Sequence, residues 1–301
     1  KLAVDVIQSL VDAPQGTEIE PRLVEAYRLL LNDTELDQAL VAKMLLLPSE
    51  AYLIELSEQA DVPAIHDARE QVLTHLAQAL RDDLLACYQR NAGQGDYQLT
   101  PGAIARRSLR NTALAWLLHI DDEQGRALAV EQFEQADNMT DRLGALRALV
   151  NSGFESDRIR ALAEFFERFQ DDPQVVELWF SVQASSDRAG QLPQIQALLE
   201  HPAFDWKNPN KVRSVVGVFA GQNLAAFHKP DGSGYRFLAD QVCRLDDSNP
   251  QIAARLVSPL TRWKKFSPQY SSQMKTALER IRDKNELSRD VYEVVHKSLA
   301  D

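Results

Sequence analysis

Histidines are the first residues to test for chemistry, because metal binding and general-base catalysis both draw on them. The chain contains six of them: His66, His75, His119, His201, His228 and His296. No H-E-x-x-H sequence occurs, so no helix offers two zinc ligands on either side of a general base. His66 lies four residues before Glu70, and His119 four residues before Glu123, so each pair could supply two metal ligands. Catalytic zinc needs three protein ligands, and we therefore interpret both pairs as solvated helix faces.

Side chains that could act as nucleophiles or as paired acids do not occur in the sequence motifs or spacings that such catalysis needs. Gly232-Ser233-Gly234 does not have the spacing of a G-x-S-x-G nucleophile elbow. Cys87 and Cys243 fall on apolar faces of expected helices, which favours buried hydrophobic roles. Adjacent aspartates recur, but neighbouring residues on a helix point in different directions, so a solvated surface is expected for them. These pairs are Asp82-Asp83, Asp121-Asp122, Asp171-Asp172 and Asp246-Asp247.

Two arginines stand in otherwise apolar surroundings. Arg213 lies near the start of a helix rich in valine, within a stretch, 207–238, whose middle carries little charge. Gln251 and Arg255 are four residues apart, which puts them on one face of another expected helix. An arginine among alanines and leucines either forms an internal ion pair or lines a polar cavity. The residues alone favour the ion pair.

Composition excludes several classes of protein. Of 301 residues, 45% are hydrophobic and 26% charged, which is ordinary for a globular chain and not for a disordered one. A net charge of −11 and a pI near 5.1 argue against nucleic acid as a partner. No run of 18 apolar residues occurs, so no membrane span or membrane partner is expected. Two cysteines make no disulfide framework, and the first residues lack the form of a signal peptide, which together favour a cytoplasmic location.

The periodicity is helical nearly throughout. Apolar residues such as Leu76, Leu80 and Leu84 recur at spacings of three and four, which predicts one helix from about Asp61 to Asn91. Several helix starts are marked by a capping residue followed by proline, which loses no hydrogen bond at the first helical position. These starts are Thr100-Pro101, Asp172-Pro173, Asn208-Pro209, Asn249-Pro250 and Ser267-Pro268.

Many helices with short connections predict an all-α fold, an irregular α-solenoid superhelix of antiparallel helix pairs similar to HEAT or armadillo proteins. No linker or low-complexity stretch divides residues 1–301, so a single helical domain is expected. The loop at 91–99, with Gly93 and Gly95, is the best candidate for a minor boundary. The valine-rich run 215–220 is expected to be a buried helix, because it follows the Asn208-Pro209 start at helical spacing.

Longer blocks of sequence carry a specific resemblance. They resemble the C-terminal domain of bacterial aminopeptidase N, in the M1 family of zinc metallopeptidases, from about residue 18 to the end of the chain. The blocks are Arg107 through Leu114, Phe133 through Asp141, Asn208 through Ser214, Ala225 through His228, Asp231 through Tyr235, Asn249 through Gln251, Ala254 through Leu256, and Pro259-Leu260. The family's G-x-M-E-N and H-E-x-x-H motifs are absent from this sequence.

The resemblance implies a role within a larger enzyme. The whole enzyme would be a zinc-dependent aminopeptidase of the alanyl type that releases N-terminal amino acids from short peptides. This segment would be the domain that encloses the substrate cavity and limits access to it, with no catalytic or zinc-binding residues of its own. Its partners would be the catalytic domain of the same polypeptide, which would hold one zinc, and short peptide substrates. The resemblance also places Gln251 and Arg255 at the substrate cavity, with Arg213 close by, as substrate-binding residues.

A free-standing α-solenoid that binds protein partners is the alternative. The two hypotheses differ in whether the reading frame continues upstream into the two missing motifs. On the first hypothesis the segment by itself is expected to be inactive.

Overall fold

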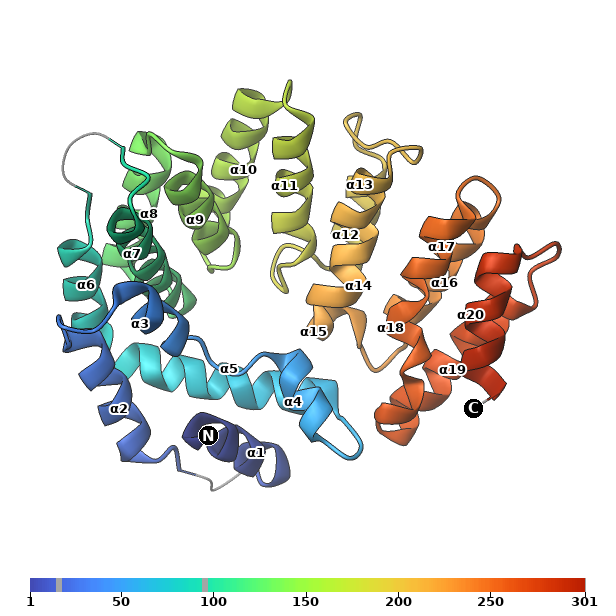
Figure 1. The fold of residues 1–301 in the computed structure, drawn as a ribbon, viewed down its shortest axis with the longest axis horizontal. Helices are drawn as coiled ribbons and strands as arrows, with labels where there is room; N and C mark the ends of the chain where they lie inside the picture. Colours follow the sequence, from blue (N-terminus) through green and yellow to red (C-terminus); the bar gives the residue numbers. More distant parts are fainter. Residues whose placement is uncertain (15–17, 94–96, 301) are drawn as a thin grey trace. The chain divides into compact units, whose positions relative to one another are not determined.

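Helices make up all the regular structure of the computed structural model, which describes residues 1–14, 18–93 and 97–300 (Figure 1). Within these residues the one β-type contact is an isolated bridge between Ala60 and Phe266. The chain packs as two compact units. Unit 1 comprises residues 1–49 and 67–165, and unit 2 comprises residues 50–66 and 166–301.

Unit 1 is built from helices of about two to five turns. They are α1 (Leu2–Asp12), α2 (Pro21–Asn32), α3 (Gln38–Met44), most of α5 (Val62–Ala79), α6 (Arg81–Arg90), α7 (Pro101–His119), α8 (Glu123–Gln135), α9 (Met139–Val150) and most of α10 (Glu155–Phe169). The long helix α7 packs against α3, α6, α8 and α9 and buries Leu109, Ala113, Leu114 and Leu117 among them. The core of unit 1 is therefore organised around α7.

A polar network also crosses this core. Gln132 of α8 is buried and donates to the side-chain oxygen of Asn111 and to the backbone oxygen of Asp141. It accepts from the hydroxyl of Tyr88, which in turn accepts from Arg110. Buried polar groups that satisfy one another fix the arrangement of the helices that carry them. The network thus fixes α6, α7, α8 and α9 relative to one another.

Unit 2 contains shorter helices. They are α4 (Glu50–Leu56), the start of α5, α11 (Pro173–Ala184), α12 (Leu192–Leu199), α13 (Pro209–Val212), the π-helical turn η1 (Arg213–Gly217), α14 (Val218–Gln222), α15 (Leu224–Phe227), α16 (Ser233–Asp246), α17 (Pro250–Leu256), α18 (Ser258–Thr261), the 3₁₀ turn η2 (Trp263–Lys265), α19 (Pro268–Arg282) and α20 (Arg289–Ala300). Edge-to-face pairs of Phe219 with Phe227 and Phe237 lie in its core.

Helix starts follow the sequence prediction closely. The side chains of Thr100, Asp172, Asn208 and Asn249 each accept a hydrogen bond from a backbone N–H of the helix that they precede. Ser267 precedes α19 without a side-chain cap bond. Its backbone N–H instead donates to the oxygen of Ala60 in the isolated bridge. The run 215–220 is helical, as predicted, and four of its six residues are buried.

Three predictions of local structure differ from the observed elements. The helix expected from Asp61 to Asn91 is two helices, because Leu80 has φ −112° and ψ 13° and ends the regular geometry. Loop 91–99, predicted as a minor boundary, belongs to unit 1, and the boundary between the units passes through α5 and α10 instead. Gly95 of this loop lies outside the described residues. Asp246 is 2% exposed, not solvated, because Lys284 and the backbone N–H of Ser288 both donate to its carboxylate.

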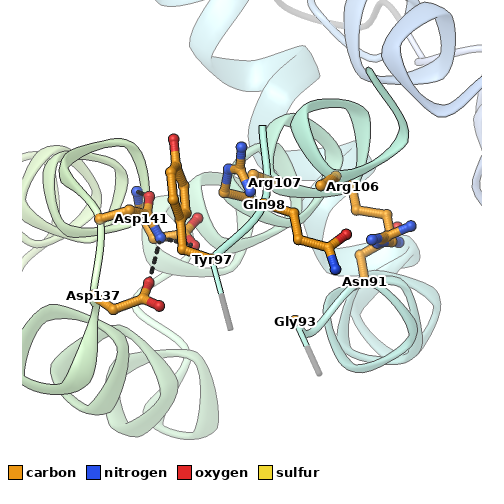
Figure 2. Close-up of a pocket in the computed structure, with 10 residues that line it drawn as sticks. Asn91, Gly93, Tyr97, Gln98, Arg106, Arg107, Asp137 and Asp141 are labelled. Atoms are coloured by element: carbon orange, nitrogen blue, oxygen red, sulfur yellow. Dashed lines mark hydrogen bonds between the residues drawn. The ribbon is translucent and has the colours of Figure 1, made fainter. Parts of the chain in front are cut away.

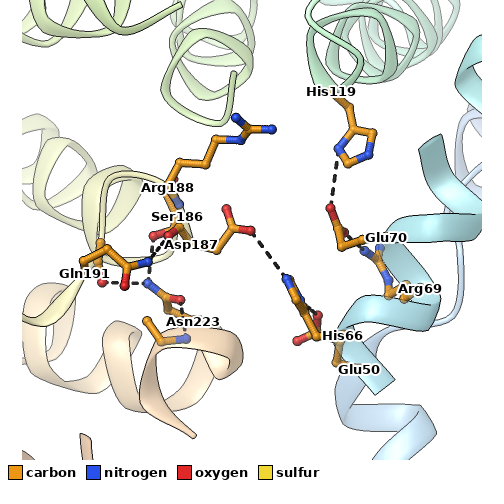
Figure 3. A network of polar contacts seen from close by, with 12 residues as sticks. Glu50, His66, Arg69, Glu70, His119, Ser186, Asp187, Arg188, Gln191 and Asn223 are labelled. Carbon is orange, nitrogen blue, oxygen red and sulfur yellow. Dashed lines mark hydrogen bonds and ion pairs between the residues drawn. The ribbon is translucent and has the colours of Figure 1, made fainter. Parts of the chain in front are cut away.

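Asn223 holds a loop of unit 2 in place. Its side-chain nitrogen lies 3.1, 2.8 and 3.0 Å from the backbone oxygens of Ala184, Ser186 and Gly190. Its side-chain oxygen accepts from the N–H of Ala226 and caps α15. One buried amide therefore satisfies the end of α11, the loop that follows it and the start of α15 (Figure 3).

We predict that Asn223→Asp lowers the free energy of unfolding by about 3 kcal/mol or more, because it replaces the donor with an oxygen facing three carbonyl oxygens. Urea unfolding followed by circular dichroism measures the loss. The exposed Asn151, whose amide donates to one backbone oxygen, provides the control Asn151→Asp, expected to change stability by less than about 1 kcal/mol. Equal losses in the two variants would contradict the role given to Asn223.

Candidate functional site

A pocket of about 360 Å³ in unit 2 brings together the two predicted arginines. Its lining consists of Arg213, Gly217, Val218, Gln222, Ile252, Arg255 and Leu256. Arg213 comes from η1 and Arg255 from α17, so two separate helical segments contribute one guanidinium group each. Gln251 is exposed at the start of α17 and is not among the residues that line the pocket. The structure therefore places two of the three predicted residues in the lining of one pocket.

Capping asparagines set the starts of both helical segments. The side-chain oxygen of Asn208 accepts from the N–H groups of Asn210 and Lys211, and that of Asn249 accepts from Ile252. The prolines that follow occupy the first helical positions of α13 and α17. The same local signal thus fixes the direction of each segment a few residues before its arginine.

The π-helical turn η1 gives Arg213 its position. The N–H of Val218 donates to the oxygen of Arg213, a bond that spans one more residue than in an α-helix. Gly217 lies at the end of this turn, where an added Cβ would come 3.7 Å from Arg213 Cβ and from Leu256 Cδ2. A widened turn of this kind is rare and frequently occurs at functional sites. The sequence reasoning predicted a helix here but not the widened turn.

The charges of the pocket are both positive. Arg213 donates from Nη2 to the side-chain oxygen of Asn210. Within residues 1–14, 18–93 and 97–300, neither Arg213 nor Arg255 has a carboxylate at ion-pair distance. Val218, Ile252 and Leu256 provide apolar walls. The pocket can therefore accept an anionic group at its two guanidinium groups and an apolar group beside them.

The histidines considered as metal ligands have other partners. In unit 2, His66 Nδ1 lies 2.6 Å from Glu50 and its Nε2 lies 3.6 Å from Asp187 (Figure 3). In unit 1, His119 Nε2 lies 2.9 Å from the hydroxyl of Thr74. Its Nδ1 lies 3.6 Å from the Glu70 carboxylate (Figure 3). The partners shown for His66 come from α4 and from the loop after α11, and those shown for His119 come from α5, so each histidine contacts side chains of other segments.

Zinc does not fit the residues that the structure describes. Among them no group of three or more histidine, cysteine, aspartate or glutamate side chains is placed to hold a metal ion. Burial raises the pKa of both Cys87 and Cys243, which keeps the thiols protonated and poor as ligands or nucleophiles. Cys243 is partly exposed, so only Cys87 is fully buried as expected.

A buried histidine that the sequence reasoning did not single out lies in unit 2. His228 is 3% exposed, and its Nδ1 lies 2.7 Å from the hydroxyl oxygen of Tyr235. The rings of Phe227 and Phe266 also contact it. Burial lowers the pKa of His228 to about 3 and raises that of Tyr235. Both groups are therefore neutral near pH 7 and serve the core.

Comparison with known protein families agrees with the helical architecture. The family described as "Domain of unknown function (DUF3458_C) ARM repeats" matches residues 1–300. The chain belongs to this family. The ARM-repeat description agrees with the predicted all-α, solenoid-like fold, which the helices of both units confirm. None of the described helices combines the length and the apolar character needed to cross a membrane.

Named relatives are aminopeptidases. The chain is 38% identical over 286 residues to aminopeptidase N of Escherichia coli (strain K12), covering 95% of this chain and 33% of that protein. It is 39% identical over 299 residues to aminopeptidase N of Haemophilus influenzae, covering 99% of this chain and 34% of that protein. The crystal structure of Legionella pneumophila aminopeptidase A in complex with aspartic acid matches with a TM-score of 0.87 and 30% identity, over 99% of this chain and 36% of that one.

These matches fit the C-terminal domain of aminopeptidase N and confirm the resemblance inferred from the sequence blocks. The chain spans about a third of the length of the curated relatives that it matches.

The buried His228 makes a pH dependence testable. Between about pH 3 and pH 6.5 the unfolded chain binds a proton at this histidine that the folded chain does not, so the free energy of unfolding falls as the pH falls through this window. We predict that His228→Phe flattens that dependence by about 1.4 kcal/mol per pH unit. Chemical unfolding at a series of pH values measures the slope. The exposed His75 gives the control His75→Phe, and an unchanged slope in His228→Phe would contradict the prediction.

Proposed function

We propose that this chain is the substrate-enclosing C-terminal domain of a zinc-dependent aminopeptidase that releases N-terminal amino acids from short peptides. The relatives called aminopeptidase N support this reading, since the chain matches about a third of each. The observation that carries the site assignment is the pocket at which Arg213 and Arg255 meet without a carboxylate partner among the described residues. In this proposal both arginines bind the carboxylate at the far end of a short peptide.

The chemistry of the pocket suits that ligand. Guanidinium groups recognise carboxylates through paired, charge-assisted hydrogen bonds, and two of them compensate for the loss of water around the anion. The apolar walls beside them suit the side chain of a peptide residue. Gln251, one turn before Arg255 on α17, supplies a neutral donor and acceptor next to the same ligand.

The zinc and the catalytic groups belong, in this proposal, to the catalytic domain of the same polypeptide. Around α3 the chain exposes Leu36, Leu40, Met44 and Leu46, and such apolar surface suits a contact with another domain. Both cysteines are free thiols, which suits a reducing, cytoplasmic location.

The substrate role of Arg255 is tested in the full-length enzyme. We predict that Arg255→Ala weakens the binding of di- and tripeptides roughly tenfold to a hundredfold, because a charge-assisted hydrogen bond is lost. An amino-acyl anilide, which lacks the carboxylate, should bind nearly as before. The inhibition constants of the peptides and the KM of the anilide measure the difference.

Two further variants sharpen the comparison. Arg280→Ala removes an exposed arginine of unit 2 that pairs with Asp240 and should spare both kinds of substrate. Gly217→Leu keeps both pocket arginines but extends a side chain into the space between Arg213 and Leu256, and it should weaken peptide binding by steric exclusion. If Arg255→Ala affects peptides and the anilide equally, the arginine has a structural role and the proposed site is wrong.

A separate prediction concerns the chain by itself. The purified 301-residue chain should hold no stoichiometric zinc and should not cleave an alanyl or arginyl anilide, because hydrolysis of this type needs a metal-bound water and a general base. Metal analysis after dialysis and an anilide assay with added zinc provide the measurements. Zinc-dependent cleavage that a chelator abolishes would contradict the assignment of catalysis to another domain.

A further inference from the structure

The pocket that contains Arg213 and Arg255 has an apolar floor and a charged rim. Ile252 and Leu256 of α17 are buried, at 7% and 6% exposure, and Val218 of α14 is half-buried. These three side chains form the floor. The two arginines are exposed and form the rim. A ligand that has both an apolar and an anionic part is therefore expected to enter with its apolar part first.

Gly217 provides the space above this floor. It lines the pocket at the end of η1, and an added Cβ would lie 3.7 Å from Arg213 Cβ and 3.7 Å from Leu256 Cδ2. These are ordinary van der Waals distances, so a methyl group would fit there without strain. It would, however, occupy the gap between the rim and the floor. The absence of a side chain at this position thus keeps the gap open.

The volume of the pocket, about 360 Å³, is large enough for a bulky side chain. An apolar cavity of ~150 Å³ already binds benzene. The pocket can therefore hold the side chain of a leucine or a phenylalanine together with the carboxylate of the same residue.

The positive charge of the rim is not compensated. Arg213 donates to the neutral side chain of Asn210, which orients the guanidinium group without cancelling its charge. In the part of the chain that the structure describes, no carboxylate lies at ion-pair distance from Arg213 or Arg255. The rim therefore attracts a carboxylate and repels a cationic side chain.

The pocket of unit 1 that Figure 2 shows differs in both respects. It is smaller, with a volume of about 70 Å³. Its aspartates, Asp137 and Asp141, both accept hydrogen bonds from the side-chain amide of Asn138. Those carboxylates are already engaged, whereas the two guanidinium groups above the apolar floor in unit 2 are available to a ligand.

We propose that Gly217 determines the specificity of the unit 2 pocket, which receives the C-terminal residue of a short peptide and selects a large apolar side chain there. That side chain packs on Val218, Ile252 and Leu256, and the guanidinium groups of the rim bind its carboxylate. A C-terminal glycine leaves the floor uncovered, and a C-terminal lysine brings a further cation to two arginines. This inference rests on the proposed function in taking the ligand to be a peptide, and it adds which C-terminal residue is selected.

Four acetylated amino acids serve as probes, because each reproduces the last residue of a peptide. We expect N-acetyl-L-leucine to bind the 301-residue chain at least about tenfold more tightly than N-acetylglycine, since its side chain is removed from water. Nα-acetyl-L-lysine and N-acetyl-L-leucine amide, which lacks the carboxylate, should also bind at least about tenfold more weakly than N-acetyl-L-leucine. Shifts of the backbone amide resonances of α14 and α17 measure the dissociation constants.

One pair of variants tests the role of Gly217. Gly217→Ala should weaken N-acetyl-L-leucine at least about fivefold and change N-acetylglycine by less than about twofold, because the added methyl group occupies space that only the larger probe needs. Gly221→Ala is the matched control. Gly221 lies in α14 outside the lining, an added Cβ there would meet nothing within 4 Å, and the binding of both probes should be unchanged. Circular dichroism confirms that each variant is folded.

The outcomes separate this inference from the proposed function. If the leucine amide binds as tightly as N-acetyl-L-leucine, the arginines do not bind a carboxylate, and both are wrong. If the carboxylate matters but leucine and glycine bind alike, or if the two alanine variants behave alike, the proposed function stands and this inference is overturned. It is also overturned if N-acetyl-L-leucine causes no saturable shift at concentrations up to about 50 mM.

Discussion

Short helices impose the main constraint on this fold, because each helix end leaves backbone groups without intrahelical partners. Helix α13 has 4 residues and α17 has 7, so the end groups make up more than half of the backbone groups in each. Asparagine caps followed by proline satisfy the starts of both. Those starts lead to Arg213 and Arg255, and the position of each guanidinium therefore depends on a cap about one and a half turns earlier. The candidate site rests on local hydrogen bonds as much as on apolar burial.

Sequence patterns specify these local features well and specify contacts between helices poorly. A capping residue followed by proline predicts a helix start well, because the cap side chain and the backbone N–H that it binds lie within three residues of each other. The partners of His66 and His119 could not be inferred in the same way. Spacing along one helix identifies a shared face, but His66 contacts Glu50 and Asp187, which other segments supply. The burial of Asp246 has the same origin, since Lys284 of the α19–α20 connection satisfies it.

The spacing of apolar residues also did not predict the departures from regular helical geometry. Leu76, Leu80 and Leu84 keep their spacing of four through the point at which α5 gives way to α6, so the apolar face shows no sign of the change. In the candidate site, the apolar surroundings and the helical spacing singled out Arg213, Gln251 and Arg255, but only the family resemblance assigned them to a substrate cavity. The structure adds that Arg213 and Arg255 share a pocket and that Gln251 lies outside its lining. Among the described residues the two arginines of this pocket have no acidic partner, although acidic residues outnumber basic ones in the chain, 44 to 33.

The π-helical turn holds one residue more than the α-helix around it and takes up that residue by widening locally. The helical segments on either side therefore keep nearly the rotation that an uninterrupted α-helix would give them. Deleting Val216 would give ordinary α-helical hydrogen bonding and remove only one of several buried valines, and Arg213 would keep nearly the same direction. In a regular helix the loss of one residue would instead rotate everything before it by about 100°. The length of the chain between the Asn208 cap and the pocket can thus change by one residue at this turn without moving the guanidinium away.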